Sequence, residues 1–266
     1  MSRDTRPIGL FDSGLGGLTV VRALLDLVPG ERIVYFGDTG RFPYGPKPAG
    51  EVLKYSTEIA DVLIARDVKM IVIACNSASA AALDHLRDYV EVPVTGVIEP
   101  GVRAARRATQ SGRIGVIGTV GTIASGAYQG AAAAIDNSLE LTCAACPGFV
   151  EFVEAGDVES DQVHVLAERL LAPIRAAKVD TLVLGCTHYP LLARTIADVM
   201  GPDVVLVSSA EETAFEVREL VAGSGHGPAP DNRVQFVTSG DVETFRHLGA
   251  RFCGPEVERV EAWSWS

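Results

Sequence analysis

The stretches Met70-Ile-Val-Ile-Ala-Cys-Asn-Ser77 and Thr181-Leu-Val-Leu-Gly-Cys-Thr-His188 decide the fold. Each is a continuous apolar run that ends in a small residue, a cysteine and polar residues. Continuous apolar runs of this length are typical of parallel strands that are covered on both faces. The two stretches therefore predict two buried strands, each leading into a loop that carries a thiol.

A second pair of stretches is also alike. Ile8-Gly-Leu-Phe-Asp-Ser-Gly14 and Ile114-Gly-Val-Ile-Gly-Thr-Val-Gly121 each combine an apolar run with a loop of small residues. In both pairs the second member follows the first by a nearly equal distance along the chain. Loops of α/β proteins can look alike by chance, but two pairs in the same order favour two similar α/β halves.

Apolar runs and helical patterns alternate along the rest of the chain, which predicts βαβ crossovers and an α/β fold with parallel sheets. The capping-box spacing of Ser209-Ala-Glu-Glu212 marks the start of a late helix. The predicted strands are Ile8–Phe11, Arg32–Phe36, Met70–Ala74, Val94–Ile98, Ile114–Gly118, Leu139–Cys143, Thr181–Gly185, Val204–Val207 and Val234–Val237. The predicted helices are Gly50–Arg66, Ser77–Tyr89, Gly101–Gln110, Ser160–Lys178, Leu191–Met200, Ser209–Val221 and Val242–Leu248, with a loop at Gly223–Pro230.

Composition excludes several classes of protein. The 266 residues carry a formal net charge of −11, with 47% hydrophobic and 21% charged residues, as in a globular chain. The acidity argues against binding to nucleic acid or to an anionic membrane, because both need Lys/Arg patches. No apolar run approaches the roughly 18 residues of a membrane span. No secretory apolar segment follows Met1–Pro7, so we expect a cytoplasmic location with reduced thiols.

Cys75 and Cys186 are the strongest candidates for chemistry. In a doubly wound sheet, ligands bind beyond the carboxyl ends of the strands, where both cysteines are expected. A following helix N-terminus should lower the pKa of each thiol and favour the thiolate. A single cysteine after a strand would be better explained as a buried apolar residue. Two of them in matching halves favour a function.

The other three cysteines are expected to be structural. Cys143-Ala-Ala-Cys146 has the spacing of a redox pair or of half a zinc site. A zinc site needs a second pair of ligands, and none is evident, so no metal is expected. The surrounding residues resemble a strand, which would direct the two thiols to opposite faces. Cys253 lies in no motif.

Several polar residues follow other predicted strands. The loop Asp12–Gly17 lacks the spacing of a dinucleotide or P-loop motif, and Asp12 can cap a helix or face a ligand. The turn-rich loop 37–47 is a candidate pocket wall or lid. Thr119 and Thr122 can bind a carboxylate or cap a helix. His188 follows Cys186 by two residues, which favours a role in protonation over a purely structural one.

Taken together, five motifs resemble the glutamate racemase family over residues 8 to about 213. They are Phe11-Asp-Ser-Gly-Leu-Gly-Gly17, Gly37-Asp-Thr with Pro43-Tyr-Gly45, Ala74-Cys-Asn-Ser-Ala-Ser79, Cys146-Pro with Phe149-Val and Val153-Glu154, and Leu184-Gly-Cys-Thr-His-Tyr-Pro190. Ser77 departs from the threonine of many members but keeps the hydroxyl. The last fifty residues carry little of the resemblance.

The resemblance implies two parallel-sheet α/β domains related by pseudo-twofold symmetry, with the active site in the cleft between them. With its help the first domain is placed at 1–98 plus 210–266 and the second at 99–209. It further implies that no cofactor is used and that the product D-glutamate supplies peptidoglycan synthesis, and hence cell-wall formation and cell shape.

The resemblance also assigns residues to roles. Cys75 and Cys186 would be the catalytic thiols, and Asp12, Glu154 and His188 would assist proton movement. The residues implied for substrate binding are Asp12, Ser13, Pro43, Tyr44, Gly45, Asn76, Ser77, Thr119, Thr122, Thr187 and His188. Inversion of Cα needs a base on one face and an acid on the other, and two thiols supply both without moving either. Cys75 would deprotonate D-glutamate, and Cys186 would deprotonate L-glutamate.

Three functions remain open at this point. The first is racemisation of L- and D-glutamate, and the second is racemisation of aspartate or another small acid, which a substrate panel would decide. The third is a non-catalytic binding module, or a racemase with a second role. Some glutamate racemases inhibit DNA gyrase, and nothing in this sequence establishes that interaction. The resemblance also leaves a homodimer open.

Overall fold

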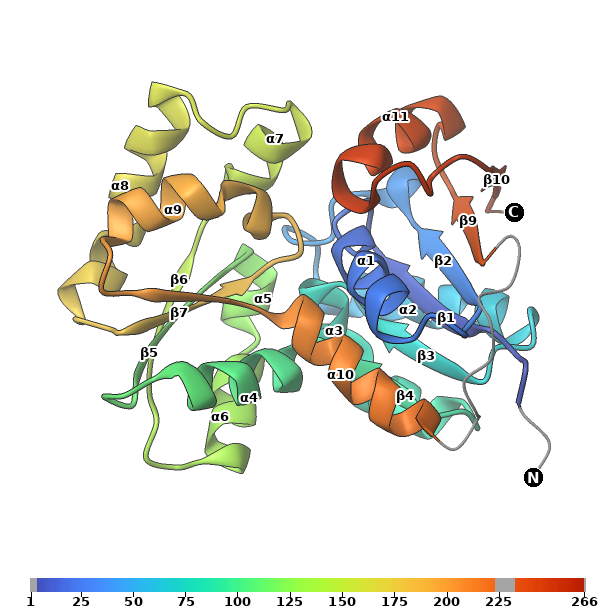
Figure 1. The fold of residues 1–266 in the computed structure, drawn as a ribbon, viewed down its shortest axis with the longest axis horizontal. Coiled ribbons are helices and arrows are strands. Elements are labelled where there is room, and N and C mark those ends of the chain that lie inside the picture. The colour runs from blue at the N-terminus through green and yellow to red at the C-terminus, as the bar shows by residue number, and fades with distance from the viewer. Residues whose placement is uncertain (1–3, 223–232, 266) are drawn as a thin grey trace. The chain divides into compact units, whose positions relative to one another are not determined.

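The computed structural model describes residues 4–222 and 233–265, so the predicted loop at Gly223–Pro230 lies outside the described residues. The chain divides into two compact units (Figure 1). The first combines Met1–Val97 with Thr213–Ser266, and the second is Ile98–Glu212. The predicted domain boundaries, at 98/99 and 209/210, fall beside this division.

The first unit holds a six-stranded sheet of parallel strands in the order β10-β9-β2-β1-β3-β4. Helices α1 and α11 pack together, as do α2 and α3, which is the pairing expected when a doubly wound sheet is covered on both faces. The elements are β1 (Ile8–Asp12), α1 (Leu18–Leu27), β2 (Ile33–Gly37), η1 (Thr39–Arg41), α2 (Ala49–Ile64), β3 (Met70–Ile73), α3 (Asn76–Tyr89), β4 (Val94–Gly96), β9 (Val234–Thr238), α11 (Val242–Cys253) and β10 (Val260–Ala262). Strands β1, β2 and β3 are buried along their whole length, as their continuous apolar sequences predict.

The second unit holds a four-stranded parallel sheet in the order β6-β5-β7-β8. Helix α4 packs with α6, and α8 packs with α9. The elements are α4 (Ile98–Ala108), β5 (Arg113–Gly118), α5 (Val120–Ala124), α6 (Ala127–Ile135), β6 (Glu140–Ala145), α7 (Phe149–Glu154), α8 (Asp161–Ala176), β7 (Thr181–Gly185), η2 (Tyr189–Leu192), α9 (Ala193–Met200) and β8 (Val205–Ser208), with α10 (Ser209–Val221) running across the division of the chain.

The two sheets share one topology. The order β2-β1-β3-β4 in the first unit matches β6-β5-β7-β8 in the second, strand for strand along the chain. In each case the chain moves to one side of the first strand and then returns to its other side. The point where the order reverses lies between β1 and β3 in one unit and between β5 and β7 in the other. The predicted fold class of two similar parallel-sheet α/β domains is confirmed.

Several element boundaries differ from the sequence-based expectations, and three of them have a visible cause. The strand expected at Val94–Ile98 ends at Gly96, and Ile98 already belongs to α4. The helix expected from Leu191 is preceded by the 3₁₀ turn η2, where Pro190 lies at a position that suits proline in a helical first turn. Helix α10 begins at Ser209 itself, and the side chain of Ser208 accepts the N–H of Ala210 at 3.3 Å, so Ser209 is not the capping residue.

Candidate active site

Cys75 lies at the carboxyl end of β3, beside the point where the strand order of the first unit reverses. It is the N-cap residue of α3, and only 5% of its surface is exposed. Its thiol donates to Ser13 Oγ across 3.7 Å, and Ser13 follows the neighbouring strand β1. The parallel pairing of β1 with β3 thus brings together two residues that are far apart in the sequence.

The expectation of a lowered pKa is wrong for Cys75. Burial raises the pKa of this thiol to about 12, and the charge of Asp12 adds to the rise. The N–H groups of Ala78 and Ser13 and the Ser13 hydroxyl offset it only in part. Desolvation disfavours the thiolate more than the start of α3 favours it. At neutral pH Cys75 is therefore a thiol.

Asp12 ends β1 and is fully buried. Its Oδ2 accepts the N–H of Gly14 at 2.9 Å, whereas α1 begins later, with Gly17 as its N-cap. Asp12 therefore fixes its own loop and does not cap the helix. Gly17 is required for close packing, because a Cβ there would lie 2.7 Å from the Asp12 Cβ and 2.9 Å from the Ala74 Cβ.

Tyr44 belongs to the loop that follows β2 and is buried. Its hydroxyl donates to Asp38 Oδ2 in a short hydrogen bond. Burial and the Asp38 charge raise the pKa of Tyr44 well above its ordinary value, so the phenol stays protonated. Sequence reasoning missed Asp38, because two of its partners, Ser239 and Trp265, come from distant parts of the chain. Gly45 is buried beside Tyr44, and Pro43 is partly exposed.

Cys186 occupies the matching position in the second unit. It follows β7 directly and is 6% exposed. Its Sγ lies 3.9 Å from His188 Nδ1, and His188 Nε2 lies 2.7 Å from Glu154 Oε1. The His188 side chain is 3% exposed and the Glu154 side chain 24%, so the chain of three groups leads from a buried thiol toward solvent.

The hydrogen bond to Glu154 sets the tautomer of His188. A carboxylate only accepts, so Nε2 of the neutral ring carries the proton and donates it to Glu154. Nδ1 then holds a lone pair on the side of Cys186. This arrangement, in which a base faces the nucleophilic atom and a third group orients the base, can take a proton from the thiol.

The remaining predicted residues follow the carboxyl ends of β3, β5 and β7. Thr119 caps α5 by accepting the N–H of Thr122 at 3.3 Å, so the capping interpretation of this pair is confirmed. Asn76 and Ser77 form the first turn of α3 and are buried. Thr187 lies between Cys186 and His188 and is also buried.

Each unit therefore gathers one set of predicted residues at its own sheet. The first unit carries Asp12, Ser13, Pro43, Tyr44, Gly45, Cys75, Asn76 and Ser77. The second carries Thr119, Thr122, Glu154, Cys186, Thr187 and His188.

The three other cysteines pack into the structure. Cys253 is 1% exposed on α11, and Cys146 is 1% exposed directly after β6. Burial and the charge of Cys186 raise the pKa of Cys146 to about 12. Burial raises the pKa of Cys143 to about 11. None of the three follows a strand at a point where the strand order reverses, and this position distinguishes Cys75 and Cys186 from them.

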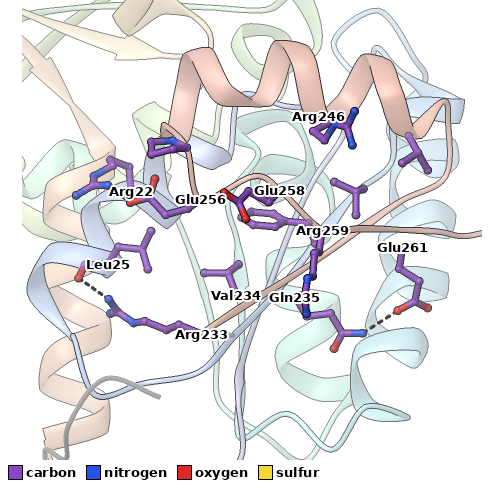
Figure 2. Close-up of a pocket in the computed structure, with 14 residues that line it drawn as sticks. Arg22, Leu25, Arg233, Val234, Gln235, Arg246, Glu256, Glu258, Arg259 and Glu261 are labelled. Carbon is purple, nitrogen blue, oxygen red and sulfur yellow. Dashed lines mark hydrogen bonds and ion pairs between the residues drawn. The ribbon is translucent and has the colours of Figure 1, made fainter. Parts of the chain in front are cut away.

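A cavity of about 1160 Å³ lies elsewhere in the first unit, between α1, α11 and the β9–β10 edge (Figure 2). Three of the four arginines that line it have partners among the described residues. Arg22 pairs with Asp26 and Glu256, and Arg233 donates to the Leu25 carbonyl at 2.8 Å. None of the predicted site residues lines this cavity, so it is separate from the candidate active site.

Among residues 4–222 and 233–265, no cluster of three or more His, Cys, Asp or Glu side chains has the arrangement of a metal site. Within the same residues, no helix has the length and apolar character needed to cross a bilayer.

The fold is that of an amino-acid racemase, and the comparison with protein families agrees. The model of the Asp/Glu/Hydantoin racemase family matches residues 18–216. The chain belongs to the Asp/Glu/Hydantoin racemase family, and it is accordingly an isomerase.

Individual relatives narrow the class. The chain is 54% identical over 265 residues to the glutamate racemase of Mycobacterium leprae, covering 98% of this chain and 97% of the relative. A glutamate racemase structure from Bacillus anthracis matches with a TM-score of 0.90 at 40% identity, over 98% and 97% of the two chains. One from Francisella tularensis, in complex with D-glutamate, matches with a TM-score of 0.91 at 34% identity, over 98% of each chain. These relatives support glutamate racemase as the activity of the chain.

Proposed function

We propose that this protein interconverts L- and D-glutamate by proton transfer at Cα between two thiols, without a cofactor. The observation that carries the proposal is the equivalence of Cys75 and Cys186. Each follows the same strand of the same four-strand order, at the point where ligands bind in doubly wound sheets. A mechanism with two like groups, one for each face of a carbon, requires such a repeat.

The two thiols have different surroundings, which suit opposite roles in one direction of the reaction. Cys75, with a raised pKa, rests as a thiol and can donate a proton. Cys186 has the imidazole of His188 3.9 Å away, which can accept its proton and so produce the thiolate base. In the direction from L- to D-glutamate, Cys186 deprotonates Cα and Cys75 protonates the opposite face. The reverse reaction exchanges the roles.

A carbanion beside a carboxylate must be stabilised where its charge develops. Each unit supplies hydrogen-bond donors that can stabilise this charge. The first unit offers the Ser13 hydroxyl, the Asn76 amide and the N–H groups at the start of α3, and the second offers the Thr187 hydroxyl. The substrate is itself an anion, and the protein carries a net charge of −11, so binding must depend on these local donors. Bound D-glutamate in the Francisella relative supports glutamate as the ligand of this site.

The biological role follows from the product. D-glutamate is a building block of peptidoglycan, so the proposed reaction would serve cell-wall synthesis and cell shape. This role places the enzyme in the cytoplasm, where glutamate is abundant and thiols are reduced.

The decisive experiment is solvent deuterium exchange. In D₂O the enzyme should incorporate deuterium at Cα of either glutamate enantiomer and produce the opposite enantiomer. A Cys75→Ser/Cys186→Ser double variant should do neither, while Cys143→Ser serves as the matched thiol control with normal exchange. A protein with both thiols intact that incorporates no deuterium would contradict the proposal. The same assay with aspartate decides between the two small acids.

A further inference from the structure

The tail that follows β10, residues 263–265, contacts the loop that carries Tyr44. After β10, the N–H of Trp263 donates to the Thr238 carbonyl at 2.7 Å, which keeps the tail beside the end of β9. Two residues later, Trp265 Nε1 donates to Asp38 Oδ1 at 3.0 Å. The tail therefore contacts the same carboxylate that accepts the Tyr44 hydroxyl.

Asp38 connects the tail to the loop. It is fully buried, and a buried carboxylate needs several donors to offset the loss of water. Its Oδ1 accepts from Trp265 and, at 2.6 Å, from Ser239 Oγ. Its Oδ2 accepts from Tyr44 and, at 2.7 Å, from Arg41 Nε. Removal of one donor therefore changes the strength of the hydrogen bonds that the remaining donors, including Tyr44, make to Asp38.

Arg41 makes a second connection between the tail and the loop. Its guanidinium carbon lies 3.8 Å from the ring centroid of Trp265 and 3.9 Å from that of Tyr55, so the cation is held between two aromatic faces. The Arg41 side chain is 15% exposed, which strengthens such contacts relative to water. Trp265 also packs on Phe36, with ring centroids 5.5 Å apart.

We propose that Trp265 is a positioning residue for substrate binding. By donating to Asp38 and covering Arg41, it holds the loop after β2 so that Tyr44 and Gly45 face the ligand. The inference rests on the proposed function, in which this loop contacts glutamate. The tail lies beyond residues 18–216, which the family model matches.

Trp263 provides a matched control in the same tail. Its ring packs on Phe36 at 6.1 Å and on Trp265 at 5.9 Å between centroids. Its Nε1 is buried, and among the described residues it has no hydrogen-bond acceptor. Trp265→Phe therefore removes an indole N–H that binds Asp38, whereas Trp263→Phe removes one that binds none of the described groups.

The first test compares the steady-state kinetics of these two variants. Trp265→Phe should raise the KM for glutamate roughly three- to tenfold with a smaller change in kcat, because a hydrogen bond to a charged group is lost and binding is affected before chemistry. Trp263→Phe should leave KM unchanged. Equal KM values in the two variants, or a loss in Trp265→Phe confined to the amount of folded enzyme, would overturn the inference.

The second test needs no turnover. Urea unfolding of Trp265→Phe, Tyr44→Phe and the double variant should give non-additive losses, since both side chains donate to Asp38. The same cycle with Trp263→Phe should be additive. Additive losses for Trp265 and Tyr44 would overturn the link. A wild-type enzyme without exchange would contradict the racemase proposal alone, and this cycle would still decide whether the tail holds Tyr44.

Discussion

The two cysteines occupy the same place in two copies of one topology, yet their neighbours differ. Cys75 is surrounded by the Ser13 hydroxyl, backbone N–H groups and the negative charge of Asp12. Cys186 lies 3.9 Å from an imidazole that is oriented by Glu154. The two units therefore share the same strand order, but the residues around the two thiols differ.

The unlike surroundings of the two cysteines indicate that a symmetric reaction does not require symmetric sites. Because L- and D-glutamate are equally stable in solution, the two directions must have equal kcat/KM, whatever the local chemistry. Each thiol only has to reach its own two protonation states fast enough. In the first unit a raised pKa favours the thiol form of Cys75. In the second unit the imidazole of His188 can accept the proton of Cys186.

The largest expected effect comes from removing either thiol. Cys75→Ser and Cys186→Ser should each lower kcat for racemisation by about 10³–10⁴-fold, because a hydroxyl is a far weaker acid than a thiol and its alkoxide is not accessible at neutral pH. Chiral chromatography of the product measures the rate. Cys143→Ser, a half-buried thiol of β6, should keep normal activity. Substantial activity in either single variant would break the two-thiol scheme.

The next effect tests whether His188 serves Cys186 alone. His188→Gln should lower kcat roughly 10²-fold, because Gln cannot take up the thiol proton. Deprotonation by Cys186 then becomes more rate-limiting. The primary isotope effect should rise with Cα-deuterated L-glutamate and fall with Cα-deuterated D-glutamate.

The control is His164→Gln, which changes another His–Glu pair, His164 with Glu168, on the surface of α8. It should change neither rate nor isotope effect. An equal change of the isotope effect with both enantiomers in His188→Gln would mean that His188 serves both thiols, and the contrast between the two units would be lost.

The framework was predictable from the sequence, because continuous apolar runs such as Thr181–Gly185 define buried parallel strands. The edge strand β10 was not predicted, since its three residues are half-buried or exposed and show no apolar run. Strand ends were less accurate than strand centres: at Ile98 an apolar residue continues the strand pattern but belongs to the next helix.

The site was predictable where the interacting residues are close together in the sequence. Cys186 and His188, which are two residues apart, are an example. Contacts between distant residues could not be predicted. Asp38 accepts hydrogen bonds from Ser239 and Trp265, which lie about two hundred residues further along the chain. The sign of the Cys75 pKa shift was also missed, because the sequence shows a following helix but not the depth of burial.

A smaller effect tests the part that charge plays at Cys75. Asp12 raises the pKa of this thiol, so Asp12→Asn should lower that pKa and speed alkylation of Cys75 by iodoacetamide at pH 8 about tenfold. Peptide mass spectrometry follows this cysteine separately from the others. Asp84→Asn, at a fully exposed position of the same helix α3, should leave the rate unchanged. A slower reaction in Asp12→Asn would contradict the assigned sign.

The smallest effect concerns Ser13, whose contact with Cys75 is long at 3.7 Å. The Ser13 hydroxyl lowers the pKa of the thiol, so Ser13→Ala should raise it and slow alkylation at pH 8 by about threefold, as expected for one weak hydrogen bond. The direction is opposite to that of Asp12→Asn in the same loop, so the two variants control for each other. Cys186, in the other unit, should react at an unchanged rate in both. A change at Cys186 as large as that at Cys75 would mean that the two thiols titrate together and would replace the picture of two separately tuned groups.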